Sequence, residues 1–516
     1  MIRIENLTFG FEPALPPLFE NVNVQLRAGE IALVAGVTGS GKSSFLKSLC
    51  GLIPNFSGGV LSGSISIDGT EILGTRSSNL ATLIGYVSQQ AESSFVADTV
   101  AEEIAFVLEQ HGFSREEMSA RVSWAATAVG LAHMLERPCR ELSGGEQQRL
   151  AIAAAIAGGA QVLLLDEPTS ELDPNGAGQI VQLLSDLAKQ RGITVIVAEH
   201  KFDRLLSVVD AVLIVADQRI KQLDTPAALG ELVGVESPMF ALSRKAGWHP
   251  HPVSIAKAKQ LWATNPGQLR VRQVGKGQIA PTQLPVTPLL SCVNFEVKVG
   301  KTAVASVPRL EVNPGETVAV IGPNGAGKSS FFWGLVGELP TSGDIRNLAS
   351  IALVPQAASD LLLLQTVGHE LQVADKSAAK PAGTTEGILE SLVGKLDPSL
   401  HPRDISAGQQ LGVALAIQLV RDENLIILDE PTRGLDYRAK QNLVMLLKRL
   451  NSQGIGLLVA SHDMDFVAEV ADKCIQLHAG KVVAAGRPEV ILTSLGEQAP
   501  TAWQITRQVL SVSEVV

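Results

Sequence analysis

The 516-residue sequence predicts an α/β fold that occurs twice, each copy built on a mostly parallel sheet. An eight-residue glycine pattern at 36–43 returns at 322–329, and each copy follows a short apolar run and opens a helix-like stretch. Downstream, apolar runs at 161–165 and 424–428 each end in Asp-Glu. Continuous apolar runs of this length are typical of strands buried on both faces of a sheet.

Each glycine pattern is predicted to form a phosphate-binding loop between a strand and a helix. Glycines allow backbone N–H groups and the helix dipole to point at phosphates. Lys42 and Lys328 would supply charge to the β- and γ-phosphates, and Ser43 and Ser329 a hydroxyl to Mg²⁺. The alternative is a glycine turn with a structural lysine, but repetition in the same setting favours a nucleotide site. The nucleotide-binding candidates in the two loops are Gly36, Gly39, Gly41, Lys42, Ser43, Ser44, Gly322, Asn324, Gly325, Gly327, Lys328, Ser329 and Ser330.

Composition excludes several other classes of protein. With 46% hydrophobic and 18% charged residues, the chain suits a folded α/β protein and not a disordered one. No stretch offers about 18 uninterrupted apolar residues, and the start lacks a signal-peptide core, so we expect no membrane span and no secretion. A net charge of −10 argues against nucleic acid as the main partner. Widely spaced cysteines predict reduced cytosolic thiols at Cys50, Cys139, Cys292 and Cys474.

The order of elements is the same in both copies, with one difference. An alternating strand and Asp-Gly turn at 64–69 follow the first loop, whereas the second copy has only a shorter segment at 341–346. We therefore expect the second copy to have lost about one hairpin. Further strands at 193–198 and 455–460 lead to His200 and His462, at the carboxyl edge where open α/β sheets place their active groups.

A second anion-binding element is predicted at Leu-Ser-Gly-Gly-Glu-Gln-Gln, residues 142–148. Ser143 and two glycines start an alanine-rich helix, and helix N-termini attract anions. The alternative is an ordinary capping box in which Ser143 pairs with Glu146. A capping box would not explain why this heptapeptide lies about 20 residues before the Asp166-Glu167 pair, so we favour the anion site.

Together these motifs resemble a fused pair of ABC-type ATPases over nearly the whole chain. The resemblance implies two P-loop nucleotide-binding domains. Each would have a mostly parallel sheet core, an antiparallel β-subdomain (reduced in the second copy) and a helical subdomain. We expect the domains at 1–240 and 286–500, a basic proline-containing linker at 241–285 and a C-terminal tail at 501–516.

The resemblance also implies roles for individual residues, with ATP and Mg²⁺ as ligands. Asp166 and Asp429 would hold Mg²⁺, while Glu167 and Glu430 would activate the attacking water. The alternatives without a catalytic role are a helix N-cap for the Asp-Glu pairs, a structural role for the two strand-end histidines, and a core position for Phe11. The remaining implied residues are the switch histidines His200 and His462, the Q-loop residues Gln89 and Gln356 (which also sense Mg²⁺), the adenine-stacking Phe11, and the nucleotide-site aspartates Asp173 and Asp436.

In such proteins two domains pack head to tail, so each ATP is closed in by the serine-glycine element of the other domain. The implied composite sites are Lys42, Ser43 and Glu167 with Ser406 and Gly408, and Lys328, Ser329 and Glu430 with Ser143 and Gly145. The second signature carries Ala407 in place of Gly144, and we take Val297, which cannot stack, as the equivalent of Phe11. We therefore expect two hydrolytic sites of unequal rate, the Lys42 site being the weaker.

Two stretches, 51–59 and 95–106, resemble the ATPases of energy-coupling-factor (ECF) vitamin and metal importers. This resemblance implies a transmembrane coupling subunit, a separate substrate-binding membrane subunit and a place on the cytoplasmic face of the cell membrane. The alternatives are the tandem ATPase of a monosaccharide importer or, from another class, a soluble ABC protein acting on ribosomes or DNA. The linker could bind anionic lipid, although a solvated strap is the simpler expectation. Its basic residues are Arg244, Lys245, Lys257, Lys259, Arg270, Arg272 and Lys276.

Overall fold

The structure is a computed structural model that describes residues 1–515 except 13–14, 171, 233–235, 266–286 and 301. The chain divides into two compact units. Unit 1 comprises Met1–Phe240 and His249–Lys257, and unit 2 comprises Ala241–Trp248 and Ala258–Val516. The helices in the described part of the chain are each too short or too polar to span a lipid bilayer.

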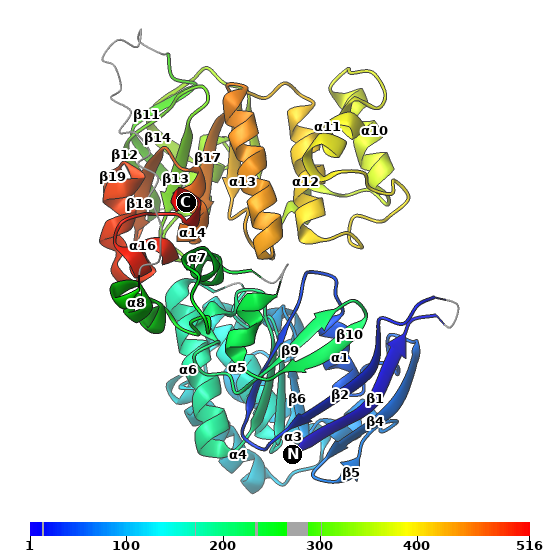
Figure 1. Cartoon of the computed structure of the whole chain (residues 1–516). Coiled ribbons are helices and arrows are strands. Elements are labelled where there is room, and N and C mark those ends of the chain that lie inside the picture. The colour runs from blue at the N-terminus through cyan, green and yellow to red at the C-terminus, as the bar shows by residue number, and fades with distance from the viewer. Residues whose placement is uncertain (13–14, 171, 233–235, 266–286, 301, 516) are drawn as a thin grey trace. The chain divides into compact units, whose positions relative to one another are not determined.

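A six-stranded sheet forms the core of unit 1, with the order β10-β9-β3-β8-β7-β6 (Figure 1). Its strands are parallel except for β10, which pairs antiparallel with β9 at one edge. The central strands are buried along their whole length, as expected within a parallel sheet. The strands are β3 (Ile31–Ala35), β6 (Ile84–Val87), β7 (Val162–Asp166), β8 (Thr194–Ala198), β9 (Ala211–Ala216) and β10 (Arg219–Leu223).

Unit 1 also contains an antiparallel sheet and a group of packed helices. The sheet has the order β2-β1-β4-β5 and comprises β1 (Ile2–Gly10), β2 (Phe19–Leu26), β4 (Val60–Ile67) and β5 (Thr70–Glu71). Helices α3, α4 and α5 pack on one another as a helical subdomain. The helices are α1 (Lys42–Leu49), α2 (Ser77–Leu80), α3 (Val100–Gln110), α4 (Arg115–Ala128), α5 (Gly144–Ala157) and α6 (Pro174–Arg191).

Unit 2 repeats this plan in a nine-stranded sheet with the order β14-β11-β12-β19-β18-β13-β17-β16-β15. Its antiparallel β-subdomain joins the core where Ser306 of β12 pairs with Lys481 of β19. The described chain passes directly from β14 to β15, which agrees with the predicted loss of a hairpin. The strands are β11 (Leu290–Val299), β12 (Thr302–Val312), β13 (Thr317–Ile321), β14 (Thr341–Asn347), β15 (Ile351–Val354), β16 (Leu425–Asp429), β17 (Gly456–Ser461), β18 (Lys473–His478) and β19 (Lys481–Gly486).

The helices of unit 2 include a helical subdomain of α10, α11 and α12, which lie together in Figure 1. The tail also folds onto this unit, because Ile505 and Leu510 are buried and Leu510 belongs to the core around β16 and β17. The helices are α9 (Lys328–Leu335), α10 (Val367–Ser377), α11 (Thr384–Val393), α12 (Ala407–Leu419), α13 (Tyr437–Ser452), α14 (Met464–Val470), α15 (Pro488–Ile491) and α16 (Thr501–Thr506).

The segment predicted to be a solvated linker is helical and partly buried where the structure describes it. It contains two helices, α8 (Ile255–Thr264) and α7 (Pro238–Ala246), the second of which we did not predict. Trp248 is buried, and its indole N–H donates to the Asn265 carbonyl at 2.8 Å. This stretch is therefore not solvated throughout, although Lys245, Lys257 and Lys259 are exposed, as expected of a solvated strap. Arg270, Arg272 and Lys276 lie outside the described residues.

The register of the antiparallel strands corrects the predicted equivalent of Phe11. Asn6 in β1 and Asn294 in β11 both have positive φ, 51° and 49°, and mark the same irregularity in the two units. Counting from these asparagines, Phe11 corresponds to Val299 and not to Val297. Val297 is fully buried in the strand, whereas Val299 is 53% exposed. The identification of Val297 was wrong because the sequence gives no marker of strand register.

Candidate functional site

The glycine pattern of unit 1 forms a tight loop between β3 and α1. Gly41 caps α1 with φ of 103°, a conformation that few side-chain-bearing residues adopt. A Cβ on Gly36 would lie 2.6 Å from the Val215 carbonyl oxygen, so only glycine fits there. The corresponding loop of unit 2 is equally tight, since a Cβ on Gly322 would lie 2.3 Å from the Leu477 carbonyl oxygen. Both loops therefore have the close-wrapped backbone that a phosphate cradle requires.

The loop lysines are buried and held against their own loops. The Lys42 ammonium donates to the carbonyl oxygens of Gly36 and Val37, both at 3.0 Å. The Lys328 ammonium donates to those of Gly322 at 2.9 Å and Pro323 at 3.2 Å. Each ammonium group is thus fixed in the loop where a bound phosphate would meet it.

Asp166 and Asp429 end the buried strands β7 and β16, one beside each loop. Burial raises the pKa of both carboxyl groups, and hydrogen bonds from Ser43 and Ser329 counteract part of that rise. The Asp429 Oδ1 atom is buried and has no hydrogen-bond partner among the described residues. A buried carboxylate oxygen with an open position beside a serine hydroxyl fits Mg²⁺, which takes oxygen ligands.

Glu430 follows Asp429 and is surrounded by cationic and imidazole nitrogens. One carboxylate oxygen lies 3.2 Å from the Lys328 ammonium, and the other lies 2.9 Å from His462 Nδ1 and accepts from the His462 backbone N–H at 3.2 Å. Burial alone would raise the pKa of Glu430, but His462 and Lys328 outweigh it and lower the pKa to about 2. Glu430 is therefore ionised at neutral pH and can accept a proton or a hydrogen bond from water.

Glu167 occupies the same position in unit 1 with different partners. One carboxylate oxygen lies 2.8 Å from His200 Nε2, and the other accepts from the Gln89 amide at 3.2 Å. Glu167 and Glu430 share a left-handed backbone, with φ of 50° and 49°. The structure thus brings together the predicted loop, metal, water and switch residues within each unit.

Comparison with known proteins agrees with this geometry. The family model described as "ABC transporter" matches residues 19–170 and 306–433. A relative from Streptomyces coelicolor, named "Putative ABC transporter ATP-binding protein", is 34% identical and covers 100% of this chain and 99% of its own length. The chain belongs to the ABC transporter ATPase family. It carries two ABC ATPase domains, binds ATP and hydrolyses it.

Two further similarities extend over both ABC domains. The protein named "Putative HMP/thiamine import ATP-binding protein YkoD" from Bacillus subtilis is 27% identical and covers 95% of this chain and 92% of its own length. The solved structure "Model of ribosome-bound archaeal Pelota and ABCE1" has a TM-score of 0.64 at 20% identity, covering 96% of this chain and 80% of that one. At this identity the second match shows the fold alone.

The signature serines of the ABC domains, Ser143 and Ser406, are N-caps of α5 and α12. Ser143 forms the capping box with Glu146 that we considered as the alternative to an anion site. Gly144 does not have positive φ, and a Cβ there would meet only a Leu172 methyl at 3.8 Å. Ala407 therefore causes no backbone strain in the free helix, so a need for positive φ at this position does not explain a weaker Lys42 site.

Other predicted nucleotide contacts lie in defined positions. Asp173 and Asp436 are N-caps of α6 and α13, and each accepts a backbone N–H at 2.8 Å. Phe11 is 52% exposed, with its ring 4.9 Å from that of Phe9, so it is not a core phenylalanine. Gln356 is exposed after β15, as Gln89 is after β6.

Glu199 is a buried carboxylate to which sequence reasoning gave no role. It accepts from the Thr169 hydroxyl at 2.6 Å and from the His200 backbone N–H at 3.0 Å, and so joins the switch histidine to the loop after Glu167. Burial and the charge of Glu167 raise the pKa of Glu199. Unit 2 has Ser461 at this position, a difference visible in the sequence.

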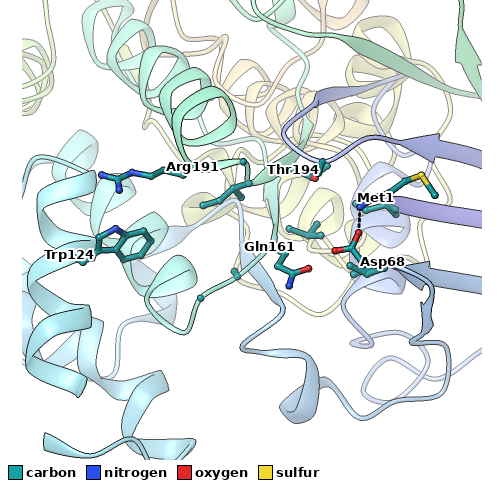
Figure 2. Close-up of a pocket in the computed structure, with 14 residues that line it drawn as sticks. Met1, Asp68, Trp124, Gln161, Arg191 and Thr194 are labelled. Atoms are coloured by element: carbon teal, nitrogen blue, oxygen red, sulfur yellow. Dashed lines mark hydrogen bonds and ion pairs between the residues drawn. The ribbon is translucent and has the colours of Figure 1, made fainter. Parts of the chain in front are cut away.

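A cavity of about 330 Å³ lies in unit 1 (Figure 2). Val162 at the start of β7 lines it, whereas Asp166 is at the other end of that strand. The cavity is lined by residues that begin β7 and β8, whereas the phosphate loop follows the carboxyl end of β3. Figure 2 shows the Met1 ammonium and Asp68 in contact, at 2.5 Å, and Trp124 beside Arg191. The cavity includes none of the predicted nucleotide residues, so we do not place ATP there.

Proposed function

We propose that this ABC ATPase energises a membrane importer of the ECF type, with a vitamin or a metal ion as cargo. The observation that carries the proposal is that one chain contains two ABC domains, each with its own phosphate loop, Asp-Glu pair and histidine. Two stretches of the same chain, 51–59 and 95–106, resemble ECF ATPases. The similarity to a relative named as an HMP/thiamine import protein, over 95% of this chain, supports it.

Within each domain, the described contacts suggest how hydrolysis proceeds. The loop N–H groups and Lys42 or Lys328 would bind the phosphates, and Asp166 with Ser43, or Asp429 with Ser329, would hold Mg²⁺, which neutralises phosphate charge. Glu167 or Glu430 would orient and deprotonate the attacking water. His200 and His462, which contact these glutamates, would report the γ-phosphate to the rest of the domain.

We further propose that the two domains form an intramolecular head-to-tail pair. Ser143 and Gly145 would close the Lys328 site, and Ser406 and Gly408 the Lys42 site. Phe11 and Val299 would lie under the two adenines. Asp173 and Asp436 would line the sites from the starts of α6 and α13, and Gln89 and Gln356 from the Q-loops. ATP would bias a two-state switch toward the closed pair.

The partners in this proposal are a transmembrane coupling subunit and a separate membrane subunit that binds the cargo. The ATPase would then be a peripheral protein on the cytoplasmic face. The two other readings of the sequence lead to other partners: a monosaccharide importer, or the ribosome. The fold similarity to ABCE1 does not favour the ribosome, because a net charge of −10 opposes binding to RNA.

Affinity purification from detergent-solubilised membranes tests the proposal. The full chain with Glu167→Gln and Glu430→Gln, incubated with ATP and Mg²⁺, should retain two kinds of small hydrophobic membrane protein in fixed ratio. The matched control is Lys42→Ala with Lys328→Ala, which should not respond to ATP. Recovery of sugar-importer subunits, or salt-sensitive recovery of ribosomes in place of membrane proteins, would refute the ECF assignment.

A further inference from the structure

Three side chains of types that bind metal ions lie close together in unit 1, and none of them is a predicted ATP-site residue. They are Glu231, at the end of a short 3-10 helix (Pro226–Glu231), and His249 and His251, which follow α7. One carboxylate oxygen and one nitrogen from each imidazole all lie within 4.8 Å of one another. We propose that these residues bind one divalent transition-metal ion of the zinc class.

The His251 side chain is built into the unit and not loosely exposed. Only 4% of the residue is accessible to solvent. It packs so closely on Gly230 that a Cβ there would lie 2.6 Å from two imidazole carbons. On another side its ring lies 6.0 Å from that of Phe240, edge to face at 64°. His251 is therefore a rigid ligand with a fixed direction, as a preorganised metal site needs.

The other two ligands can move to complete the site. Glu231 and His249 are exposed, and the His249 ring centroid lies 5.1 Å from that of His251. A tetrahedral ion with bonds of about 2.0–2.2 Å places its ligand atoms about 3.3–3.6 Å apart. Because the donor atoms already lie within 4.8 Å of one another, we expect the two exposed side chains to reach that spacing by rotation while the buried histidine stays in place.

The donor set selects the class of metal. Two imidazoles and one carboxylate suit Zn²⁺ and its neighbours Co²⁺, Ni²⁺ and Cu²⁺, whereas Mg²⁺ and Ca²⁺ prefer oxygen ligands alone. Three protein ligands leave one position for water. The Mg²⁺ that supports ATP hydrolysis would therefore not compete effectively for this site.

The position of the ligands gives the ion a structural role. His249 and His251 belong to the His249–Lys257 stretch of unit 1, which lies between two segments of unit 2 along the chain. Glu231 belongs to the preceding part of unit 1. An ion bound by all three would hold the His249–Lys257 stretch against the 3-10 helix at Pro226–Glu231. Chelation should then release that attachment without removing any ATP-site residue.

Titration with Co²⁺ tests the site directly. The probe is Co²⁺ alone, added to the full-length, metal-free protein without nucleotide or Mg²⁺ and followed by visible absorption. We expect one ion per chain, with a tetrahedral-type band that Zn²⁺ abolishes. His249→Gln and Glu231→Gln change only exposed ligands and should each weaken binding by at least about 100-fold, beyond the 10–100-fold typical of losing an outer-shell partner.

Matched controls separate this site from other histidines and carboxylates. His133→Gln and Glu136→Gln, both exposed elsewhere in unit 1, should bind Co²⁺ as the wild type does. Gly230→Ala should weaken binding without removing a ligand, because it displaces His251. The proposal is wrong if the wild type shows no such band. It is equally wrong if the band survives both ligand changes, or if Mg²⁺-ATP abolishes it, which would place the ion at a hydrolytic site.

Discussion

Glu167 and Glu430 directly follow equivalent strands, yet their surroundings differ in charge. Glu430 lies beside the Lys328 ammonium at 3.2 Å, which favours its ionised form. Glu167 instead lies near a second carboxylate, Glu199, and burial together with the charge of Glu167 raises the pKa of Glu199. This difference offers a structural reason for unequal ATP sites, in place of the backbone strain that Ala407 does not cause.

We predict that Glu430→Gln lowers the rate of phosphate release more than Glu167→Gln does. Loss of a general base costs about 10²–10⁴-fold at its own site, so the more active site dominates the total. Steady-state release of inorganic phosphate by each variant measures the effect, with Glu136→Gln as the surface control. Equal losses and equal residual rates in the two variants would contradict asymmetry.

Val299 and Val297 make a matched pair for the adenine prediction. Stacking of a base on an aromatic ring contributes about 1–3 kcal/mol, so Val299→Phe should bind ATP at least about fivefold more tightly at the Lys328 site. A Lys42→Ala background isolates that site, and a fluorescent ATP analogue reports the affinity. Val297→Phe should instead lower the melting temperature, since overpacking a buried site costs about 1–3 kcal/mol. Tighter binding by Val297→Phe alone would restore the original assignment.

At the scale of elements, a half-buried carboxylate attaches the tail to the second ABC domain. Asp465 in α14 accepts from the Thr501 backbone N–H at 2.7 Å and from its hydroxyl at 2.8 Å, at the start of α16. Burial and the nearby charge of Asp463, itself paired with Lys440 at 2.6 Å, raise the pKa of Asp465 to about 7. Because the folded pKa exceeds the unfolded one, this contribution to stability is complete below about pH 4 and is lost as pH rises through 7.

We therefore predict that the free energy of unfolding falls by up to about 3 kcal/mol between pH 5 and 8 on account of Asp465. Asp465→Asn should remove that part of the pH dependence while keeping an acceptor for the Thr501 N–H. Urea denaturation at both pH values measures it, with the exposed Asp360→Asn as control. An unchanged pH dependence in Asp465→Asn would show that Thr501 is held in another way.

The elements that sequence could predict were those with a repeated, chemically specific pattern. The phosphate loops, the buried strands ending at Asp166 and Asp429, and the shortened β-subdomain followed from spacing and apolar runs. The sequence could not predict the helices α7 and α16, or which residue of the second domain is equivalent to Phe11. Short helices depend on tertiary burial for stability, and strand register is set by irregularities such as the one at Asn294. Glu199 was missed because its role depends on Thr169, a contact across the fold.

For the whole molecule, the head-to-tail arrangement predicts two disulfide cross-links. Ser143→Cys with Asn324→Cys, and Ser406→Cys with Thr38→Cys, should each cross-link within one chain when ATP and Mg²⁺ are bound. The four native cysteines are buried, so they should not compete. Mobility on non-reducing gels reports the closed loop, and Ser114→Cys with Asn324→Cys is the control. The cysteine pairs are tested in a background with Glu167→Gln and Glu430→Gln, which prevents turnover of ATP. If neither pair forms a disulfide with ATP and Mg²⁺ present, this arrangement is ruled out.

The left-handed backbone at Glu167 and Glu430 has a consequence for the history of the duplication. A side-chain-bearing residue in this conformation costs about 1–3 kcal/mol, and glycine would avoid that cost. A domain that no longer hydrolysed ATP would gain stability if glycine replaced the glutamate at this position. Both halves carry the unfavourable turn and a glutamate on it, as expected if each copy needs this turn for turnover of ATP.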